Sequence, residues 1–140
     1  FRHKKTDKLF AVVNTHFSLS DSTFSDNTTP LTQALELITL CKDLKNLFNC
    51  PVFPLGDFNA HRTTKNTPSP IYDILVTAFR NTSTLAKTVS HGENTNKKTL
   101  FIDHIFSFGD VTVINHSTLS QNNFKKFSDH YPIFCDIFIQ

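Results

Sequence analysis

The feature that most limits the folds open to this chain is an apolar stretch that runs directly into a polar one. Pro51-Val52-Phe53-Pro54-Leu55 leads into Gly56-Asp57-Phe58-Asn59, and Val52–Asn59 reads as a buried strand that surfaces at its C-terminal end. Alternation along a strand puts Asp57 and Asn59 on one face and Phe58 on the other. The pattern fits a polar site and a simple turn equally well, because Gly, Asp and Asn are common turn formers.

Length, charge and cysteine content limit the classes of protein to which this chain can belong. The 140 residues fit one domain. A formal net charge of +2 implies no large basic surface, so any binding of nucleic acid would have to come from a local patch. Cys41, Cys50 and Cys135 form no C-x-x-C pair, so we interpret them as core thiols. No signal peptide or membrane-length apolar run is present, so we expect no membrane span; the compartment stays open, with an intracellular one favoured. Because the chain begins with Phe1 and contains no Met, we expect a fragment or a processed product.

Hydrophobic periodicity predicts the first strand and the first helix. Leu9–His16 reads as a strand that is apolar on both faces, as at the centre of a packed sheet, and it ends in His16. Leu31–Phe48 carries an apolar stripe at helical spacing that includes Leu35 and Cys41. Thr29 is the expected N-cap, and Pro30 suits the first helical position.

A second, shorter helix and three more strands are predicted further along the chain. They cover Ile71–Phe79, Leu100–Phe108, Val111–Asn115 and Tyr131–Ile139, whereas Asn81–Lys98 and Ser117–Phe127 read as loops. Strands interleaved with helices indicate an α/β layered fold, and nothing within residues 1–140 marks a repeat or a domain boundary.

Two polar islands interrupt the apolar strands. In Ile102-Asp103-His104-Ile105-Phe106 the carboxylate of Asp103 shares a face with apolar neighbours and needs a partner, for which a histidine or a metal ion is suited. Ser128-Asp129-His130 puts an acid and an imidazole at the mouth of the last strand. It is not a hydrolytic triad, because adjacent residues on a strand diverge. The isolated histidines are interpreted as surface or core residues, namely His3, His61, His91 and His116.

Six polar residues remain, each in or at a predicted strand. They are His16, Asp57, Asn59, Asp103, Asp129 and His130. The set has no obvious side-chain nucleophile and suits a hydrolysis in which water attacks. One Asp would orient and deprotonate the water, and a hard cation held by carboxylates would polarise a phosphoryl oxygen. Asn and His would stabilise the pentavalent charge.

Four segments carry a resemblance to a known family. They are Asn14-Thr15-His16, Gly56-Asp57-Phe58-Asn59, Ile102-Asp103-His104-Ile105-Phe106 and Ser128-Asp129-His130-Tyr131-Pro132. In this order they resemble the four C-terminal motifs of the endonuclease/exonuclease/phosphatase superfamily, and the resemblance covers essentially the whole chain. It implies a partial four-layer α/β/β/α sandwich of the deoxyribonuclease I-like type, with mixed, mostly antiparallel sheets. Residues 1–140 would be the C-terminal part of one such domain, with its N-terminal part missing.

The resemblance also implies a role for each catalytic residue. His16 would hydrogen-bond the scissile phosphate. Asp57 would align or activate the attacking water, and Asn59 would help to hold the transition state. Asp103 would pair with His130 and orient it.

The implied cofactor is Mg²⁺, with Mn²⁺ as the alternative, and Asp129 and Asp57 would contribute to its site. Two departures from the family pattern matter. Pro30 stands where members commonly carry an Arg, three residues before Gln33. The half of the family domain that supplies an early Asn and the principal metal-binding Glu is absent from this sequence, so we expect the fragment to be inactive alone.

Three readings of function follow. The first is a metal-dependent hydrolase of phosphoester bonds, of the phosphodiesterase, nuclease or phosphatase type. The second is a catalytically inactive binding module of the same fold, against which retention of all six polar residues argues. The third is an unrelated α/β domain with chance motifs. The sequence does not choose among nucleic acid, phospholipid and inositol phosphate as substrate, and we expect a monomer.

Overall fold

The computed structural model describes residues 1–19, 28–90, 101–119 and 127–140. Most of the loop predicted at residues 117–127, part of that predicted at 81–98, and His91 lie outside these ranges. In chain order the elements are β1 (Ala11–His16), α1 (Thr28–Phe48), β2 (Val52–Asp57), α2 (Pro70–Ala78), β3 (Arg80–Asn81), α3 (Thr82–Leu85), β4 (Thr88–Ser90), β5 (Asp103–Ser107), β6 (Val111–Thr118) and β7 (Ile133–Ile139).

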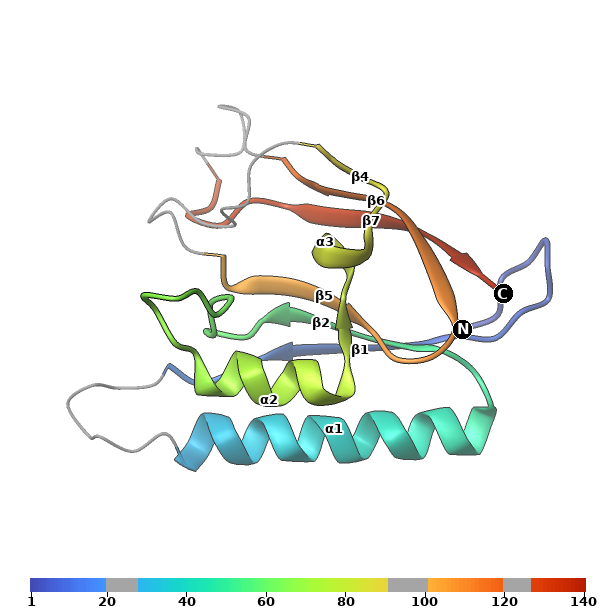
Figure 1. Ribbon diagram of the computed structural model, residues 1–140. Helices are drawn as coiled ribbons and strands as arrows, with labels where there is room; N and C mark the ends of the chain where they lie inside the picture. The colour runs from blue at the N-terminus through green and yellow to red at the C-terminus, as the bar shows by residue number, and fades with distance from the viewer. Residues whose placement is uncertain (20–27, 91–100, 120–126) are drawn as a thin grey trace.

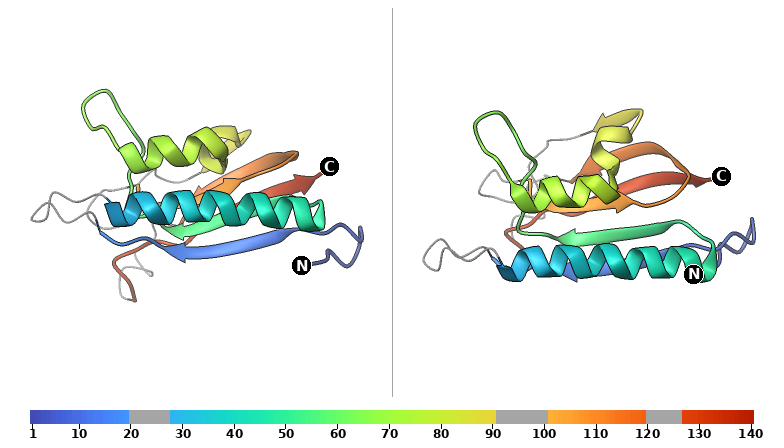
Figure 2. Two further views of the ribbon diagram at one scale, coloured as in Figure 1. Left: turned by 90° about the horizontal axis from the view of Figure 1, so that it is seen from below. Right: turned by 60° about the horizontal axis from the view of Figure 1, so that its bottom comes forward.

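The strands form two mixed sheets. The first has the order β1-β2-β5-β3 and the second the order β4-β6-β7. β1 and β2 are parallel, with α1 as the crossover between them, whereas β2–β5 and β6–β7 are antiparallel. Helices α1 and α2 cover one face of the first sheet, and the second sheet lies against the other face (Figures 1 and 2). The predicted α/β sandwich with mixed sheets is therefore confirmed.

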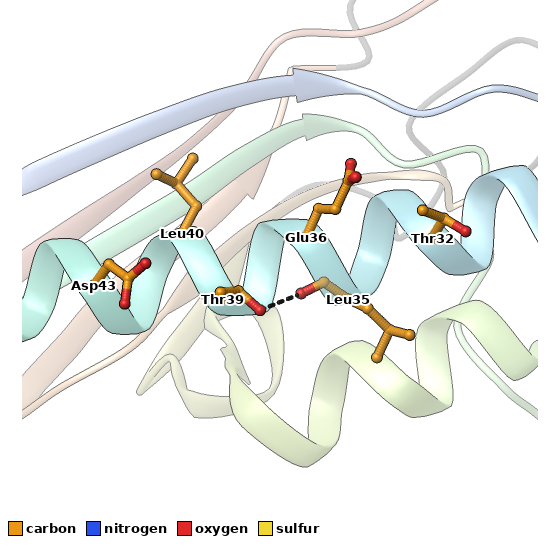
Figure 3. A pocket seen from close by; sticks show the side chains of 6 residues that line it. All are labelled: Thr32, Leu35, Glu36, Thr39, Leu40 and Asp43. Atoms are coloured by element: carbon orange, nitrogen blue, oxygen red, sulfur yellow. Dashed lines mark hydrogen bonds between the residues drawn. The ribbon is translucent and has the colours of Figure 1, made fainter.

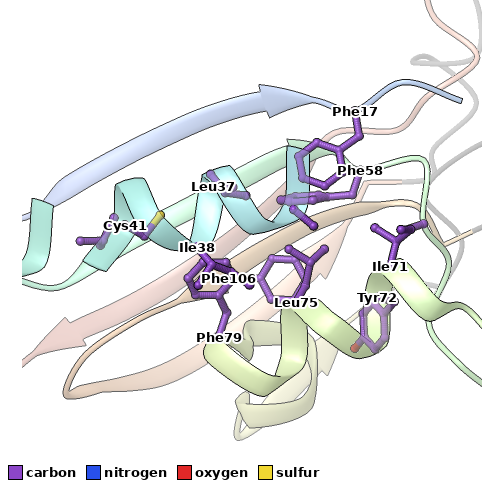
Figure 4. Packing of buried hydrophobic residues seen from close by; sticks show 13 residues of the cluster. Phe17, Leu37, Ile38, Cys41, Phe58, Ile71, Tyr72, Leu75, Phe79 and Phe106 are labelled. Carbon is purple, nitrogen blue, oxygen red and sulfur yellow. The ribbon is translucent and has the colours of Figure 1, made fainter. Parts of the chain in front are cut away.

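β2 is the strand on which both layers of core are built. Val52 faces the helices and belongs to the larger cluster, which also holds Phe58, Leu75 and Phe106 (Figure 4). Phe53, on the opposite face of the same strand, packs between the two sheets against residues of β6 and β7. A strand buried on both faces reads as a continuous apolar run, which is why the sequence indicated it so clearly.

The helix α1 departs from its prediction at two places. It already includes Thr28 and Thr29, so Thr29 is not the N-cap. Leu35 is half exposed, and Leu37, two residues further along and on another side of the helix, is buried instead. Cys41 is fully buried, as expected for a core thiol, and burial raises the pKa of this thiol to about 12.

Two strand predictions and one loop prediction are also corrected. β1 is an edge strand of the described sheet, so Val12 is 38% exposed rather than buried on both faces. The region from Asn81 contains β3, α3 and β4 instead of an irregular loop, because short elements leave no periodic signal. β2 ends at Asp57, before Asn59. No helix in the described part of the chain combines the length and the apolar character needed to cross a membrane.

Candidate active site

The carboxyl end of β2 brings three of the predicted site residues together. His16 at the end of β1 is the register partner of Asp57 at the end of β2, and Asp57 is in turn the partner of Asp103 at the start of β5. These pairings follow from one parallel and one antiparallel neighbour of the same central strand. Motifs 41 and 46 residues apart from Asp57 in the chain therefore meet at one edge of the first sheet.

Gly56 is required for β1 and β2 to approach so closely. It has φ +135°, in the region that glycine adopts without strain, and a Cβ at this position would lie 1.9 Å from the carbonyl oxygen of Thr15. The glycine in the sequence Gly56-Asp57-Phe58-Asn59 thus allows Asp57 to lie beside His16 rather than marking a flexible turn.

Asn59 joins the ends of β1 and β2. Its amide nitrogen Nδ2 donates to the carbonyl oxygen of Phe17 at 2.7 Å, and its backbone N–H donates to Oδ1 of Asp57 at 2.8 Å. Asn59 has φ +46°, which Asn tolerates better than most residues, so Asn59 does not continue the strand alternation. Gln33 of α1 accepts from the backbone N–H of Ser18 and holds the chain just beyond His16.

His130 and Asp103 form a directed pair. Nδ1 of His130 lies 2.9 Å from Oδ2 and 3.1 Å from Oδ1 of Asp103, and a carboxylate only accepts, so Nδ1 carries the proton. Burial lowers the pKa of His130, but the hydrogen bond that His130 donates to Asp103 and the charges of Asp103, Asp57 and Asp129 outweigh this effect. The pKa of His130 is therefore raised above its usual 6.5. The sequence-based expectation that Asp103 pairs with His130 agrees with this geometry.

The carboxylate of Asp57 faces two imidazoles. Its Oδ2 lies 3.4 Å from Nε2 of His16 and 3.8 Å from Nε2 of His130. The Asp57 side chain is only 15% exposed, whereas that of His16 is 72% exposed. A carboxylate oxygen that faces two imidazole nitrogens accepts hydrogen bonds, so it can position a water molecule.

The donor set fits a divalent cation in part. Ligand atoms of Asp57, Asp103 and His130 lie within 4.8 Å of one another. Mg²⁺ prefers oxygen ligands and commonly uses one or two carboxylates together with water and substrate phosphate. Within the described part of the chain, no backbone donor occupies Oδ2 of Asp57, while Asp103 is engaged by His130. Asp57 and Asp103 would be the residues to hold such an ion.

Asp129 stands apart from this group. It is exposed, it acts on His130 through its charge, and it is not among the three residues whose ligand atoms gather. Its metal role stays a prediction. Among the described histidines that the sequence left without a role, His116 is buried, and His61, two residues after Asn59, is half buried. The sequence also left His104, which follows Asp103 on β5, without a role, and the structure places it fully buried directly behind the site.

A separate hollow lies on the outer surface of α1. It has a volume of about 430 Å³, and Figure 3 shows the six side chains that line it: Thr32, Leu35, Glu36, Thr39, Leu40 and Asp43. None of these six residues is among the site residues at the strand ends. The hollow therefore adds nothing to the site at the carboxyl end of β2.

Comparison with known proteins identifies the fold. No protein-family model matches the chain, and no curated protein matches it in sequence. Among solved structures, an endonuclease/exonuclease/phosphatase from Bacteroides vulgatus aligns with a TM-score of 0.78 and 23% identity over 99% of this chain and 53% of that chain. The catalytic domain of human Nocturnin, with a bound sulfate anion, aligns with a TM-score of 0.74 and 19% identity over 99% and 50%.

Two further structures extend the comparison. The mannosyl-6-phosphatase Bt3783 of Bacteroides thetaiotaomicron has a TM-score of 0.72 and 20% identity over 98% of this chain and 54% of its own. A beta toxin from Staphylococcus aureus with bound magnesium ions has a TM-score of 0.56 and 13% identity over 89% and 48%. The chain thus spans about half the length of the structures it matches. It has the endonuclease/exonuclease/phosphatase fold, as its four motifs predicted.

Proposed function

We propose that this chain belongs to a divalent-metal-dependent hydrolase of phosphoester bonds that uses water as its nucleophile. The observation that carries the proposal is the position of Asp57, whose Oδ2 faces the Nε2 atoms of His16 and His130 while Asp103 holds the far side of His130. The names of the structural relatives, a mannosyl-6-phosphatase among them, support a phosphoester as the substrate.

The side chains divide the chemistry between them. Asp57 accepts a hydrogen bond from water and takes up its proton as the oxygen attacks phosphorus. His130, protonated and oriented by Asp103, donates from Nε2 to a phosphoryl oxygen as negative charge develops there. His16, on the exposed side, donates to another oxygen of the same group.

A bound Mg²⁺ or Mn²⁺ would polarise the phosphoryl group and neutralise part of its charge. Asp57 and Asp103 supply only part of the ligands that such an ion takes. We therefore propose that residues outside this 140-residue stretch complete the metal site, and that the stretch alone is inactive or nearly so. The beta toxin structure with bound magnesium supports this cofactor class.

The test uses the longest product of the gene together with the chain itself. Hydrolysis of bis(4-nitrophenyl) phosphate and of 4-nitrophenyl phosphate is followed with Mg²⁺, with Mn²⁺ and with EDTA. Asp57→Asn and His130→Gln should lower the rate by about 10²- to 10⁴-fold, the usual contribution of a positioned acid or base. Asp43→Asn, an exposed Asp on α1, is the matched control.

Two outcomes would reject the proposal. Variants of Asp57 and His130 that hydrolyse as fast as the parent would remove these residues from the chemistry. Binding of inorganic phosphate without turnover in any metal would instead favour the binding-module alternative.

A further inference from the structure

His104 is a buried imidazole directly behind the candidate site. It is fully buried and surrounded by aromatic rings, with ring centroids 5.8 Å from Phe58, 5.2 Å from Tyr72 and 5.3 Å from Phe106. It follows Asp103 on β5, so its side chain points to the opposite face of that strand. Asp103 faces the site, and His104 faces the core beneath it.

Both ring nitrogens of His104 have one partner each. Nε2 lies 2.8 Å from the carbonyl oxygen of Ala60, and Nδ1 lies 3.0 Å from Nδ2 of Asn81. A carbonyl oxygen only accepts, so Nε2 carries the proton. Nδ1 then has to accept a hydrogen from the Asn81 amide.

Asn81 cannot turn round to reverse this arrangement. Its Oδ1 already accepts from the backbone N–H of Ser83 at 3.0 Å and from the Ser83 hydroxyl at 2.8 Å, at the start of α3. Its Nδ2 also lies 3.3 Å from the hydroxyl oxygen of Tyr72. The amide orientation, and with it the neutral form of His104 protonated on Nε2, is therefore determined by the fold.

The carbonyl oxygen that accepts from His104 belongs to the turn that carries the site residues Asp57 and Asn59. Ala60 follows Asn59, the residue with φ +46° that bonds both Asp57 and Phe17. On the other side of this short turn, the backbone N–H of Phe58 donates to the carbonyl oxygen of Ile102 at 3.0 Å. The turn is thus held at both ends, to Ile102 just before β5 and to His104 within β5, and His104 provides the second of the two attachments.

We propose that His104 is a positioning residue, whose Nε2–H holds the carbonyl of Ala60 and thereby fixes Asp57 and Asn59 relative to Asp103. The inference rests on the proposed phosphoester hydrolysis for its catalytic consequence, but not for its geometry. One strand, β5, then sets both halves of the site: Asp103 orients His130 on one face, and His104 orients the Asp57–Asn59 turn from the other.

The experiment compares three variants in the longest product of the gene. His104→Phe keeps an aromatic ring and removes both hydrogen bonds. His104→Gln places an amide donor near the position of Nε2. His116→Phe is the matched control, because His116 is equally buried but bonds Thr82 on α3 rather than the site turn. Global stability is measured for each by urea unfolding, and all assays are made where every variant is folded.

Two readouts follow. In His104→Phe the backbone amide of Asn59 should exchange its hydrogen about 10-fold faster than in His116→Phe after correction for global stability, since the turn has lost one attachment. In the assay, kcat should fall about 10- to 100-fold with KM nearly unchanged, the usual effect of removing a partner that orients a site residue. His104→Gln should recover most of both effects.

The outcomes separate this proposal from the proposed function. If the parent does not hydrolyse phosphoesters, the proposed function fails, and the exchange of the Asn59 amide still decides the role of His104. Equal exchange at Asn59 in His104→Phe and His116→Phe overturns the positioning role, as does equal loss of kcat in these two variants.

Discussion

Nδ1 of His130 lies 2.9 Å from Oδ2 of Asp103, and this bond links the two sheets at the candidate site. Asp103 opens β5 of the first sheet, and His130 lies just before β7 of the second. A change at either residue is therefore expected to alter the chemistry of the other, because the carboxylate determines which nitrogen of the imidazole carries the proton.

Asp103→Asn should lower the pKa of His130 towards or below its usual value. The substitution removes both the charge and the strongest hydrogen bond that raise it, while burial still lowers it. Titration of the His130 ring by NMR measures this shift. Asp136→Asn, at an exposed position of β7, carries the same loss of charge and should leave the His130 titration close to that of the parent.

Hydrolysis should decline as pH rises through the raised pKa of His130. We assign the donating role to the protonated ring, and a raised pKa extends that form to a pH above 6.5. The same sign applies to stability: the contribution of protonated His130 is complete below pH 6.5 and is lost as pH rises through the folded-state pKa. A pH profile of kcat for the parent and for Asp103→Asn checks this, and an alkaline limb that does not move to lower pH in the variant would contradict it.

Stability should fall on the acid side because of His104. Burial lowers its pKa from 6.5 to about 4, against the opposing hydrogen bond to Ala60 and with smaller effects of His116 and Arg62. As pH falls below 6.5 the unfolded chain takes up a proton that the folded chain excludes, so stability is lost down to about pH 4 and then levels. The difference in pKa corresponds to about 3 kcal/mol.

Urea unfolding between pH 4 and pH 8 would measure this loss of stability, because this range includes both the usual pKa of 6.5 and the lowered pKa of about 4. His104→Gln, which does not titrate, should show a shallower dependence than the parent. His3→Gln removes an exposed histidine and should leave the slope unchanged. Parallel curves for the parent and His104→Gln would show that His104 takes up its proton in the folded state.

Gly56→Ala should destabilise the chain by about 3 kcal/mol or more, because its Cβ would meet the backbone oxygen of Thr15 in a strained conformation. Gly109→Ala is the graded comparison. Its φ is also positive, but the nearest atom to its Cβ is Cα of Pro51 at 3.2 Å, so its cost should be smaller. Thermal or urea unfolding of the two variants shows which one is destabilised more. Equal losses of stability would mean that β1 can move away from β2 to make room for the Cβ at residue 56.

Asn59→Gly and Asn59→Ala separate the two tasks of this residue. Both remove the hydrogen bond to Phe17, which costs about 1 kcal/mol. Only Ala also has to adopt φ +46°, at a further cost of about 1 kcal/mol. The free energy of unfolding should therefore be largest for the parent, smaller for Asn59→Gly and smallest for Asn59→Ala. A Gly variant no more stable than the Ala variant would show that the backbone at residue 59 relaxes.

Much of the fold could be predicted from the sequence because its central elements leave strong local signals. β2 is apolar on both faces, and α1 has a 3.6-residue stripe around Cys41. β3, α3 and β4 could not be predicted, since elements of two to four residues have no measurable period and depend on their neighbours. Leu35 was predicted inward and is half exposed, because the stripe alone does not fix which flank of a helix meets the sheet.

By itself the sequence determined which chemistry-bearing side chains stand at strand ends: His16, Asp57, Asp103 and His130. Only the tertiary structure decided how they act on one another. Register sets Asp57 between His16 and Asp103, and the stacking of two sheets brings His130 to Asp103. His104 shows the difference most clearly. In the sequence it is one polar residue in an apolar strand, whereas its protonated nitrogen and its hold on Ala60 depend on Asn81 and Ser83, 23 and 21 residues away in the chain. Such partners are selected by the packing of side chains in three dimensions, which no local pattern encodes.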